Sequence, residues 1–190
     1  MIGLVSYLVF FAIVASILAI AVLGLNLQWG NTGLFNGGVV AFFGAGAYGT
    51  LILGGGPQDG QLGGFGLFYP LALLGGMATA GLLAWGVGIL TLRLRHDYLA
   101  ISTFGIAVAF ENLMRNAQWL GGGAQGLRGF DRPLRAALGD GFLYNILFLL
   151  CVLVLLVLTY RFLETLVASP FGRQLRAIRE DETAARSLGK

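Results

Sequence analysis

The stretch LVSYLVFFAIVASILAIAVLGL, residues 4–25, carries no charged side chain over 22 residues. Because a helix rises about 1.5 Å per residue, this stretch is long enough to cross a hydrocarbon core of roughly 30 Å. A second uncharged run, FLYNILFLLCVLVLLVLTY, occupies residues 142–160. The two runs predict two membrane-spanning helices, one in each half of the chain.

The composition of the whole chain agrees with a membrane protein. Hydrophobic residues make up 57% of the 190 residues and charged residues 11%, whereas a soluble domain has roughly 25% charged residues. The 31 glycines lie within apolar runs and follow no collagen period, which is typical of closely packed membrane helices. Positive charges gather at the ends of segments, where they favour a role in membrane orientation over nucleic-acid binding.

Three further apolar segments, residues 39–53, 65–92 and 98–114, lie between these two runs. Together they predict an all-α, polytopic transmembrane helical bundle of about five spans. In this arrangement eight Lys and Arg residues lie on the side that holds the C-terminal tail, and four lie on the other side. Because cytoplasmic segments carry the excess of positive charge, we expect a cytoplasmic tail and an external N-terminus.

An uncharged polar set lies between the first two apolar segments. Its members are Asn26, Gln28, Asn31, Thr32 and Asn36. One interpretation is a plain turn between two helices. The other is a broken helix at membrane depth, whose freed backbone groups line a path for a polar solute. The second interpretation makes these five residues the candidate substrate path, and the sequence leaves both open.

Small residues recur every four positions in two of the apolar segments. The first line is Gly37, Ala41, Ala45 and Gly49, and the second is Gly76, Ala80, Ala84 and Gly88. This spacing predicts helix faces along which backbones approach closely. The sequence GAGAYG at 44–49 also matches the dinucleotide fingerprint, but no strand precedes it and no acidic residue follows about 20 positions on. Helix packing is therefore the favoured interpretation.

Few residues in the chain could carry chemistry. Glu111 and Arg115 lie four positions apart and predict an ion pair on one helix face, with a functional intramembrane charge as the alternative. His96 has no second metal ligand near it, which favours a solvated loop residue. The sequence contains no nucleophile–base pair, metal-ligand cluster or phosphate loop. We therefore expect no catalytic residue, no metal site and no cofactor in this chain.

The C-terminal block SPFGRQLRAIREDETAARSLGK, residues 169–190, differs from everything before it, because eight of its 22 residues are charged. Ser169 as a cap and Pro170 at the first helical position predict a helix start. Phe171, Leu175 and Ile178 share one face of this helix, and Asp181 is expected to cap a second short helix over 183–188. An interfacial anchor is one interpretation, but the mixed charges favour a protein partner.

Four blocks of the sequence resemble a known family of transporters. They are GLNLQWGNTGLFNGGVVAFFGAGAY at 24–48, LRLRHDYLAISTFGIA at 92–107, GGGAQGLRGFDRP at 121–133, and the block at 169–190. The chain resembles the membrane permease subunits of branched-chain amino acid ABC importers. The last block is the most specific, because it is similar to the permease loop with Glu-Ala-Ala, three residues and Gly. Ala184, Ala185 and Gly189 match, whereas Thr183 stands at the glutamate position beside Glu182.

The resemblance implies a transmembrane permease region at 1–168 and a cytoplasmic ATPase-coupling loop at 169–190. It also implies that this loop docks into a cytoplasmic ATPase and carries its motion to the membrane helices. The coupling residues it implies are Ser169, Pro170, Phe171, Gly172, Arg173, Arg176, Arg179, Glu182, Ala184, Ala185 and Gly189. Family members continue with further spans past this loop, so the chain is expected to be truncated after it.

The same resemblance implies a set of partners and a location. The partners are a second related permease subunit, cytoplasmic ABC ATPase subunits that hydrolyse the ATP, and a periplasmic amino acid-binding protein that sets most of the specificity. The location is the bacterial inner membrane, which the chain crosses several times among membrane lipid. A urea or amide ABC importer is the near alternative. A stand-alone channel or secondary carrier, and a non-functional fragment, are the alternatives from other classes.

Overall fold

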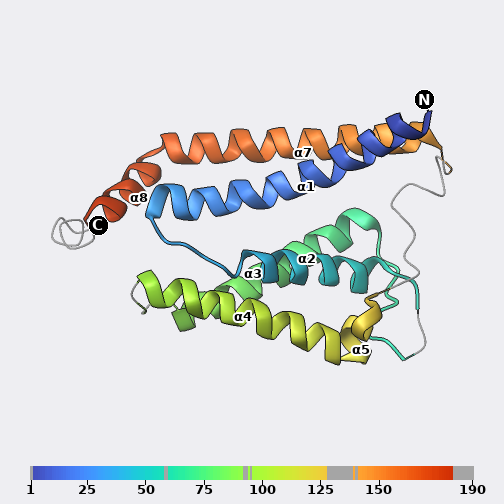
Figure 1. Ribbon diagram of the computed structural model, residues 1–190, viewed down its shortest axis with the longest axis horizontal. Coiled ribbons are helices and arrows are strands. Elements are labelled where there is room, and N and C mark those ends of the chain that lie inside the picture. The colour runs from blue at the N-terminus through green and yellow to red at the C-terminus, as the bar shows by residue number, and fades with distance from the viewer. Residues whose placement is uncertain are drawn as a thin grey trace. The chain divides into compact units, whose positions relative to one another are not determined.

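The computed structural model describes residues 2–57, 60–91, 94, 96–127, 139 and 141–181. All regular structure within these residues is helical (Figure 1). The elements are α1 (Ile2–Thr32), α2 (Val39–Gly54), α3 (Tyr69–Thr91), α4 (His96–Asn116), α5 (Gln118–Gly121), the 3-10 helix η1 (Gly123–Gln125), α7 (Phe142–Ala168) and α8 (Pro170–Glu180). The prediction of an all-α fold is confirmed for this part of the chain.

Each of the five predicted apolar segments contains a helix, but two of the helices run further than expected. Helix α1 continues through most of the polar stretch to Thr32, and α7 continues past Tyr160 to Ala168. The residue after the helix is Gly33, whose φ of 75° is the left-handed conformation that commonly follows a helix. The apolar run therefore marked where α1 lies, but this glycine marks where it ends.

The third helix starts later than the sequence predicted, because residues 65–68 are a loop. Gly63, Gly64 and Gly66 have φ values of 142°, 89° and 57°, which a helix cannot contain. The amides of Gly66 and Leu67 donate hydrogen bonds to carbonyls at the end of α2, with N–O distances of 3.0 Å in both cases. The loop thus satisfies carbonyls that the end of a helix leaves without partners.

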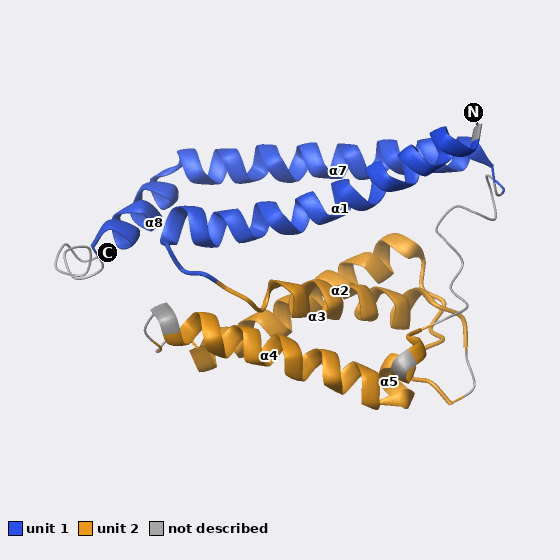
Figure 2. Cartoon of the chain, viewed as in Figure 1, with its two compact units in different colours: residues 1–35, 134–190 blue, residues 36–133 orange. Residues whose placement is uncertain are grey.

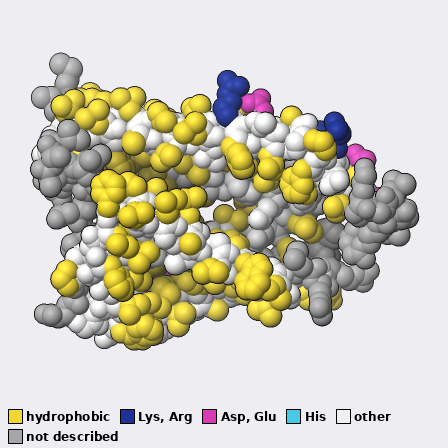
Figure 3. All heavy atoms as spheres, turned by 180° about the vertical axis from the view of Figure 1, so that it is seen from behind, with side chains coloured by type: hydrophobic (Ala, Val, Ile, Leu, Met, Phe, Trp, Pro, Cys, Tyr) yellow, Lys and Arg dark blue, Asp and Glu magenta, His cyan; other side chains and the backbone are white. Residues whose placement is uncertain are grey.

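Three of the described helices, α1, α3 and α7, are long and apolar enough to cross a membrane. Helix α2 is also apolar, but its 16 residues extend about 24 Å, which is shorter than a hydrocarbon core of roughly 30 Å. Helix α4 has 21 residues and carries the charged pair Glu111 and Arg115 in its second half. Figure 3 shows hydrophobic side chains spread over the visible face, with few charged ones among the described residues. The number of five spans stays a prediction.

The chain divides into two compact units, residues 1–35 with 134–190 and residues 36–133 (Figure 2). In the first unit α1 and α7 pack side by side and run in the same direction, so that both end beside α8. Ile13 and Ser16 of α1 and Tyr144 and Val152 of α7 are buried. The Ser16 hydroxyl donates to Ala12 O at 2.7 Å, so this buried polar group is satisfied within its own helix.

The second unit is built on close contact between α2 and α3. Ala41, Ala45 and Gly49 of the first predicted small-residue line are buried on α2, which confirms that packing face. From the second line, Gly76 is buried on α3.

The contact between α2 and α3 brings backbone against backbone. A methyl group on Gly76 would lie 2.5 Å from Gly46 O. Gly46 belongs to the GAGAYG sequence, so the helix-packing interpretation of that motif is confirmed.

Candidate functional site

The junction between α7 and α8 is a single residue, Ser169. Pro170 occupies the first turn of α8, as predicted. The Ser169 hydroxyl, however, donates to Leu166 O at 2.6 Å and forms no hydrogen bond that caps α8. The expectation of a side-chain cap is therefore wrong, because the hydroxyl turns back to the carbonyls that α7 leaves open. The Ser169 carbonyl, in contrast, accepts a hydrogen bond from Arg173 N of α8 at 3.3 Å.

Gly172 lets α8 fold back closely against the end of α7. It is buried, and a methyl group there would lie 2.5 Å from Val167 C and 2.6 Å from Val167 Cα. Three backbone atoms of Val167, including its carbonyl oxygen, surround that position. Any side chain at 172 would therefore force the two helices apart.

Two of the three arginines of α8 donate to carbonyls at the ends of the long helices. Arg176 Nη2 donates to Val167 O of α7 at 3.3 Å, and its Nε donates to Gly172 O at the same distance. Arg179 Nη1 donates to Gly30 O of α1 at 2.7 Å. These contacts hold α8 against both α7 and α1, which the sequence pattern did not predict.

The other side of α8 is open. Phe171 has a relative exposure of 50%, and Arg173 and Gln174 are exposed. The Arg173 side chain has no hydrogen-bond or ion-pair partner among the described residues. Leu175 and Ile178 are half-buried, so only these two members of the predicted apolar face are covered by the protein.

The rest of the predicted coupling loop lies outside the described residues. This applies to Glu182, Ala184, Ala185 and Gly189, and to the second short helix predicted over 183–188. Asp181 is the last described residue of the block, and its amide donates to Ala177 O at 3.1 Å. The structure therefore describes residues 169–181 of the block.

Four members of the uncharged polar set, Asn26, Gln28, Asn31 and Thr32, lie in the last two turns of α1. The Thr32 hydroxyl donates to Gln28 O at 2.5 Å and accepts from Leu34 N at 3.3 Å. It therefore bonds a carbonyl near the end of α1 and an amide just beyond the helix.

Asn36 differs from the other four. It lies in the linker between α1 and α2, and it belongs to the second unit. Its Oδ1 accepts from Gly38 N at 2.8 Å, directly before α2. Asn36 therefore has a local structural role at the start of α2.

Thr103 is a residue that the sequence analysis missed. Its side chain is almost fully buried, with a relative exposure of 1%. The hydroxyl accepts from Gly37 N at 3.0 Å and donates to Leu99 O at 2.8 Å. It thereby ties the start of α2 to α4. A lone threonine within an apolar helical run was the signal available in the sequence.

The charged pair of α4 forms as predicted, because Arg115 Nη2 and Glu111 Oε1 are 2.7 Å apart. Both side chains are more than half exposed, with relative exposures of 67% and 60%. The four-residue spacing and this geometry agree with structural pairing. Among the described residues no cluster of His, Cys, Asp or Glu could hold a metal ion.

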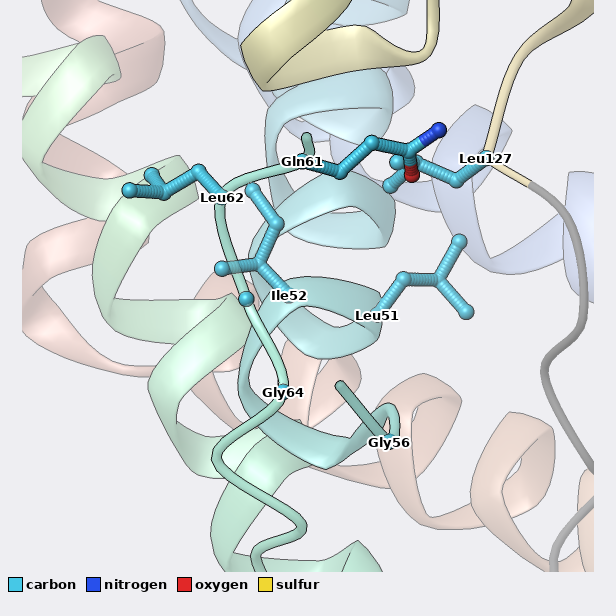
Figure 4. Close-up of a pocket in the computed structure, with 8 residues that line it drawn as sticks. Leu51, Ile52, Gly56, Gln61, Leu62, Gly64 and Leu127 are labelled. Atoms are coloured by element: carbon cyan, nitrogen blue, oxygen red, sulfur yellow. The ribbon is translucent and has the colours of Figure 1, made fainter. Parts of the chain in front are cut away.

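A small cavity lies where the loop after α2 folds back over the end of that helix (Figure 4). Its lining includes Leu51, Ile52, Gln61, Leu62 and Leu127. The enclosed volume of about 10 Å³ is close to that of a single water, so an amino acid does not fit. In the first unit an apolar groove runs between α1 and α7, lined by residues that include Ala19, Val22 and Val157.

Comparisons with known proteins agree with the sequence resemblance. Residues 7–190 match the sequence model of the family described as branched-chain amino acid transport system, permease component. The high-affinity branched-chain amino acid transport system permease protein LivM of Escherichia coli (strain K12) is 34% identical over 197 residues, covering 88% of this chain. A probable branched-chain amino acid transport permease protein LivM of Methanocaldococcus jannaschii is 33% identical over 99 residues, covering 52% of this chain and 28% of that protein.

The chain spans 42% of the length of the Escherichia coli relative. No solved structure matches it. The family match nevertheless extends over nearly all of the sequence, including the three long apolar helices and the block at 169–190. The chain is thus a membrane protein that belongs to the family of permease components of branched-chain amino acid transport systems.

Proposed function

We propose that the chain is a permease subunit of an ATP-binding-cassette importer for branched-chain or related amino acids. The observation that carries this proposal is the family match over residues 7–190. The relatives are named as permease proteins of branched-chain amino acid transport, which favours these substrates over urea or amides. The membrane helices form part of the translocation path, and the protein lies in the bacterial inner membrane.

The chain works with separate subunits. These are a second related permease, two copies of a cytoplasmic ABC ATPase and a periplasmic amino acid-binding protein. ATP hydrolysis belongs to the ATPase, and this chain is not itself an enzyme. Closure of the ATPase dimer moves the block at 169–190 and switches access between the two faces of the membrane.

The described part of α8 supports a docking role. Phe171 and Arg173 are exposed on a short helix that follows directly on a span candidate, and Arg173 has no partner among the described residues. An exposed aromatic ring beside a cation without a partner is typical of a protein interface. This is the surface that we assign to the ATPase, together with the remainder of the block.

The polar end of α1 is our candidate for the substrate path. Asn26, Gln28 and Asn31 present neutral amide dipoles, which suit a zwitterion that must be released again. We choose Asn31 as the position to test, and its side chain makes no hydrogen bond among the described residues. We expect Asn31→Leu to lower amino acid uptake without changing the amount of ATPase that co-purifies. Full uptake by this variant would favour the interpretation of a simple helix end.

The proposed function is tested by purifying the tagged chain from native membranes and by measuring uptake of radiolabelled leucine. We expect an ABC ATPase to co-purify, and we expect leucine uptake to fall when the gene is deleted. Arg173→Gln should reduce the recovered ATPase, whereas Arg161→Gln, at an exposed arginine of α7 with a side-chain exposure of 76%, should not. A parent chain that recovers no ATPase and a deletion that leaves leucine uptake unchanged would overturn the proposal. Leucine uptake that persists without ATP would favour a channel or carrier.

A further inference from the structure

The carboxyl ends of α1 and α7 are completed by groups from other parts of the chain. The last four carbonyls of a helix lack partners inside the helix. At the end of α7, Ser169 N–H donates to Thr165 O at 3.1 Å and to Leu166 O at 3.3 Å, which leaves Val167 O for Arg176. At the end of α1, Gly33 N–H donates to Trp29 O at 3.1 Å, and the next carbonyl, Gly30 O, receives Arg179.

The charge of the two arginines also suits these positions. The carboxyl end of a helix carries a partial negative charge, which a nearby cation stabilises. Neither α1 nor α7 has a basic residue in its own last turn. Arg176 and Arg179 of α8 therefore supply the cations that both helices lack.

The backbone on both sides is shaped to admit α8. Gly172 is buried against the backbone of Val167, so α8 approaches α7 at a distance that only glycine allows. Gly33 adopts a φ of 75°, and a methyl group there would lie 3.3 Å from Arg179 Cγ. The glycine that ends α1 thus also leaves room for the stem of the arginine that completes it.

We propose that Arg176 and Arg179 form a carbonyl clamp that fixes α8 to the carboxyl ends of α7 and α1, so that the three helices move as one body. Arg179 is the decisive positioning residue. It lies 149 positions from Gly30 in the chain, and its hydrogen bond is the shorter of the two interhelical contacts. A displacement of α8 therefore acts directly on the last turns of α1, where Asn26, Asn31 and Thr32 lie.

The clamp divides the three arginines of α8 between two tasks. Arg176 and Arg179 hold the helix to its own chain, whereas the Arg173 side chain engages no described residue. Charge reversal at Arg179 therefore disturbs the attachment of α8 before it disturbs any partner. Arg173, of the same residue type on the same helix, is the matched control.

The clamp can be tested without transport, by electron paramagnetic resonance of the full chain in native-lipid membranes. A nitroxide is placed at Gln174→Cys, an exposed position of α8, in a Cys151→Ser background because Cys151 is also exposed. We expect Arg179→Met to raise the mobile fraction roughly threefold to tenfold, since a charge-assisted but solvent-exposed hydrogen bond is lost. Arg179→Lys should stay near the parent value, because an ammonium can donate to the same carbonyl. Arg173→Met should leave the spectrum unchanged.

A second variant reaches the same contact from α1 and leaves α8 intact. Asparagine tolerates the left-handed conformation, so Gly33→Asn adds a side chain against the Arg179 stem with little backbone strain. We expect it to mobilise the label in the same direction as Arg179→Met. An unchanged spectrum for both Arg179→Met and Gly33→Asn overturns the clamp. Equal mobilisation by Arg173→Met also overturns it, because the effect would then not be specific to the carbonyl contact.

The consequence for transport rests on the proposed function and has its own measurement. In proteoliposomes of the complete transporter, Arg179→Met should raise the ATP hydrolysed per leucine imported while the ATPase still co-purifies. Arg179→Lys should restore most of the parent ratio, whereas a role in ATPase docking would lower co-purification instead. If no ATPase associates with the parent chain, the proposed function fails, and the spectroscopic result for the clamp still stands.

Discussion

Replacement of Gly76 by alanine should separate α2 from α3, and the same replacement at Gly81 should not. Both glycines lie on α3, so the chemical change and the host helix are identical. A methyl group at 76 would lie 2.5 Å from Gly46 O and 3.0 Å from Thr50 N, with the Thr50 hydroxyl closer still. At Gly81 nothing lies within 4 Å of the added methyl group.

The magnitude follows from these distances. Carbon atoms in normal contact lie about 3.5–4.0 Å from their neighbours, so the helices must withdraw by roughly 1 Å at Gly76. Overpacking of this kind costs about 1–3 kcal/mol, and alanine offsets about 0.5–1 kcal/mol of it because it favours the helix more than glycine does. The expected net loss in the free energy of unfolding is therefore about 0–2.5 kcal/mol, with a mid-range value of about 1 kcal/mol. Gly81→Ala causes no overpacking and should gain only the roughly 0.5–1 kcal/mol by which alanine favours the helix over glycine.

The assay is thermal unfolding of the two variants in one detergent. For a chain of this size about 1 kcal/mol corresponds to about 2–4 °C in the melting temperature, so at the mid-range loss Gly76→Ala should unfold about 2–4 °C below the parent. Gly81→Ala should unfold at the parent temperature or slightly above it. Equal melting temperatures for the two variants would refute the assignment of Gly76 to the contact between α2 and α3.

Two further predictions concern other contacts of the helices, and a third concerns the orientation of the chain in the membrane. Gly172→Ala should loosen α8 from α7 and lower stability by about 1–3 kcal/mol, measured by thermal unfolding; an unchanged melting temperature would contradict the close approach of the two helices. Thr103→Val should cost about 1–3 kcal/mol, because it leaves a backbone amide of the linker before α2 without its acceptor, whereas Thr103→Ser should stay close to the parent. Single cysteines at Gln125 and Gln174, in a Cys151→Ser background, should react with an impermeant thiol reagent from opposite sides of the membrane; reaction of both from one side would overturn the predicted orientation.

The sequence predicted the helices well because uncharged runs long enough to cross a membrane have few alternative structures. It located the ends of the helices less well, because single glycines decide them. Helix α1 passes through Asn26 and Gln28, which a helix accepts, and it stops where Gly33 adopts a positive φ. Residues 65–68 read as part of an apolar run, but the glycines before them turn the chain into a loop.

The candidate site was harder to predict, because its contacts join residues that are distant in sequence. The charge pattern of α8 showed that Arg173, Arg176 and Arg179 belong to one short helix. Only the fold shows that two of them donate to carbonyls of α7 and α1, while the third has no partner among the described residues. Thr103 was missed for the same reason, since its partner Gly37 lies 66 positions away. Hydropathy and spacing describe local structure and do not contain such pairings.

The direction of α1 and α7 restricts how many times the chain crosses the membrane. The two helices run the same way, and Arg176 and Arg179 bond α8 to the carboxyl ends of both. Two parallel spans must be separated by an odd number of crossings. If α3 alone crosses between them there are three spans, and if α2, α3 and α4 all cross there are five. If α3 and only one of α2 and α4 crossed, there would be two crossings between α1 and α7, and α1 and α7 would be antiparallel. When α3 crosses, α2 and α4 must therefore either both cross or both stay within one leaflet.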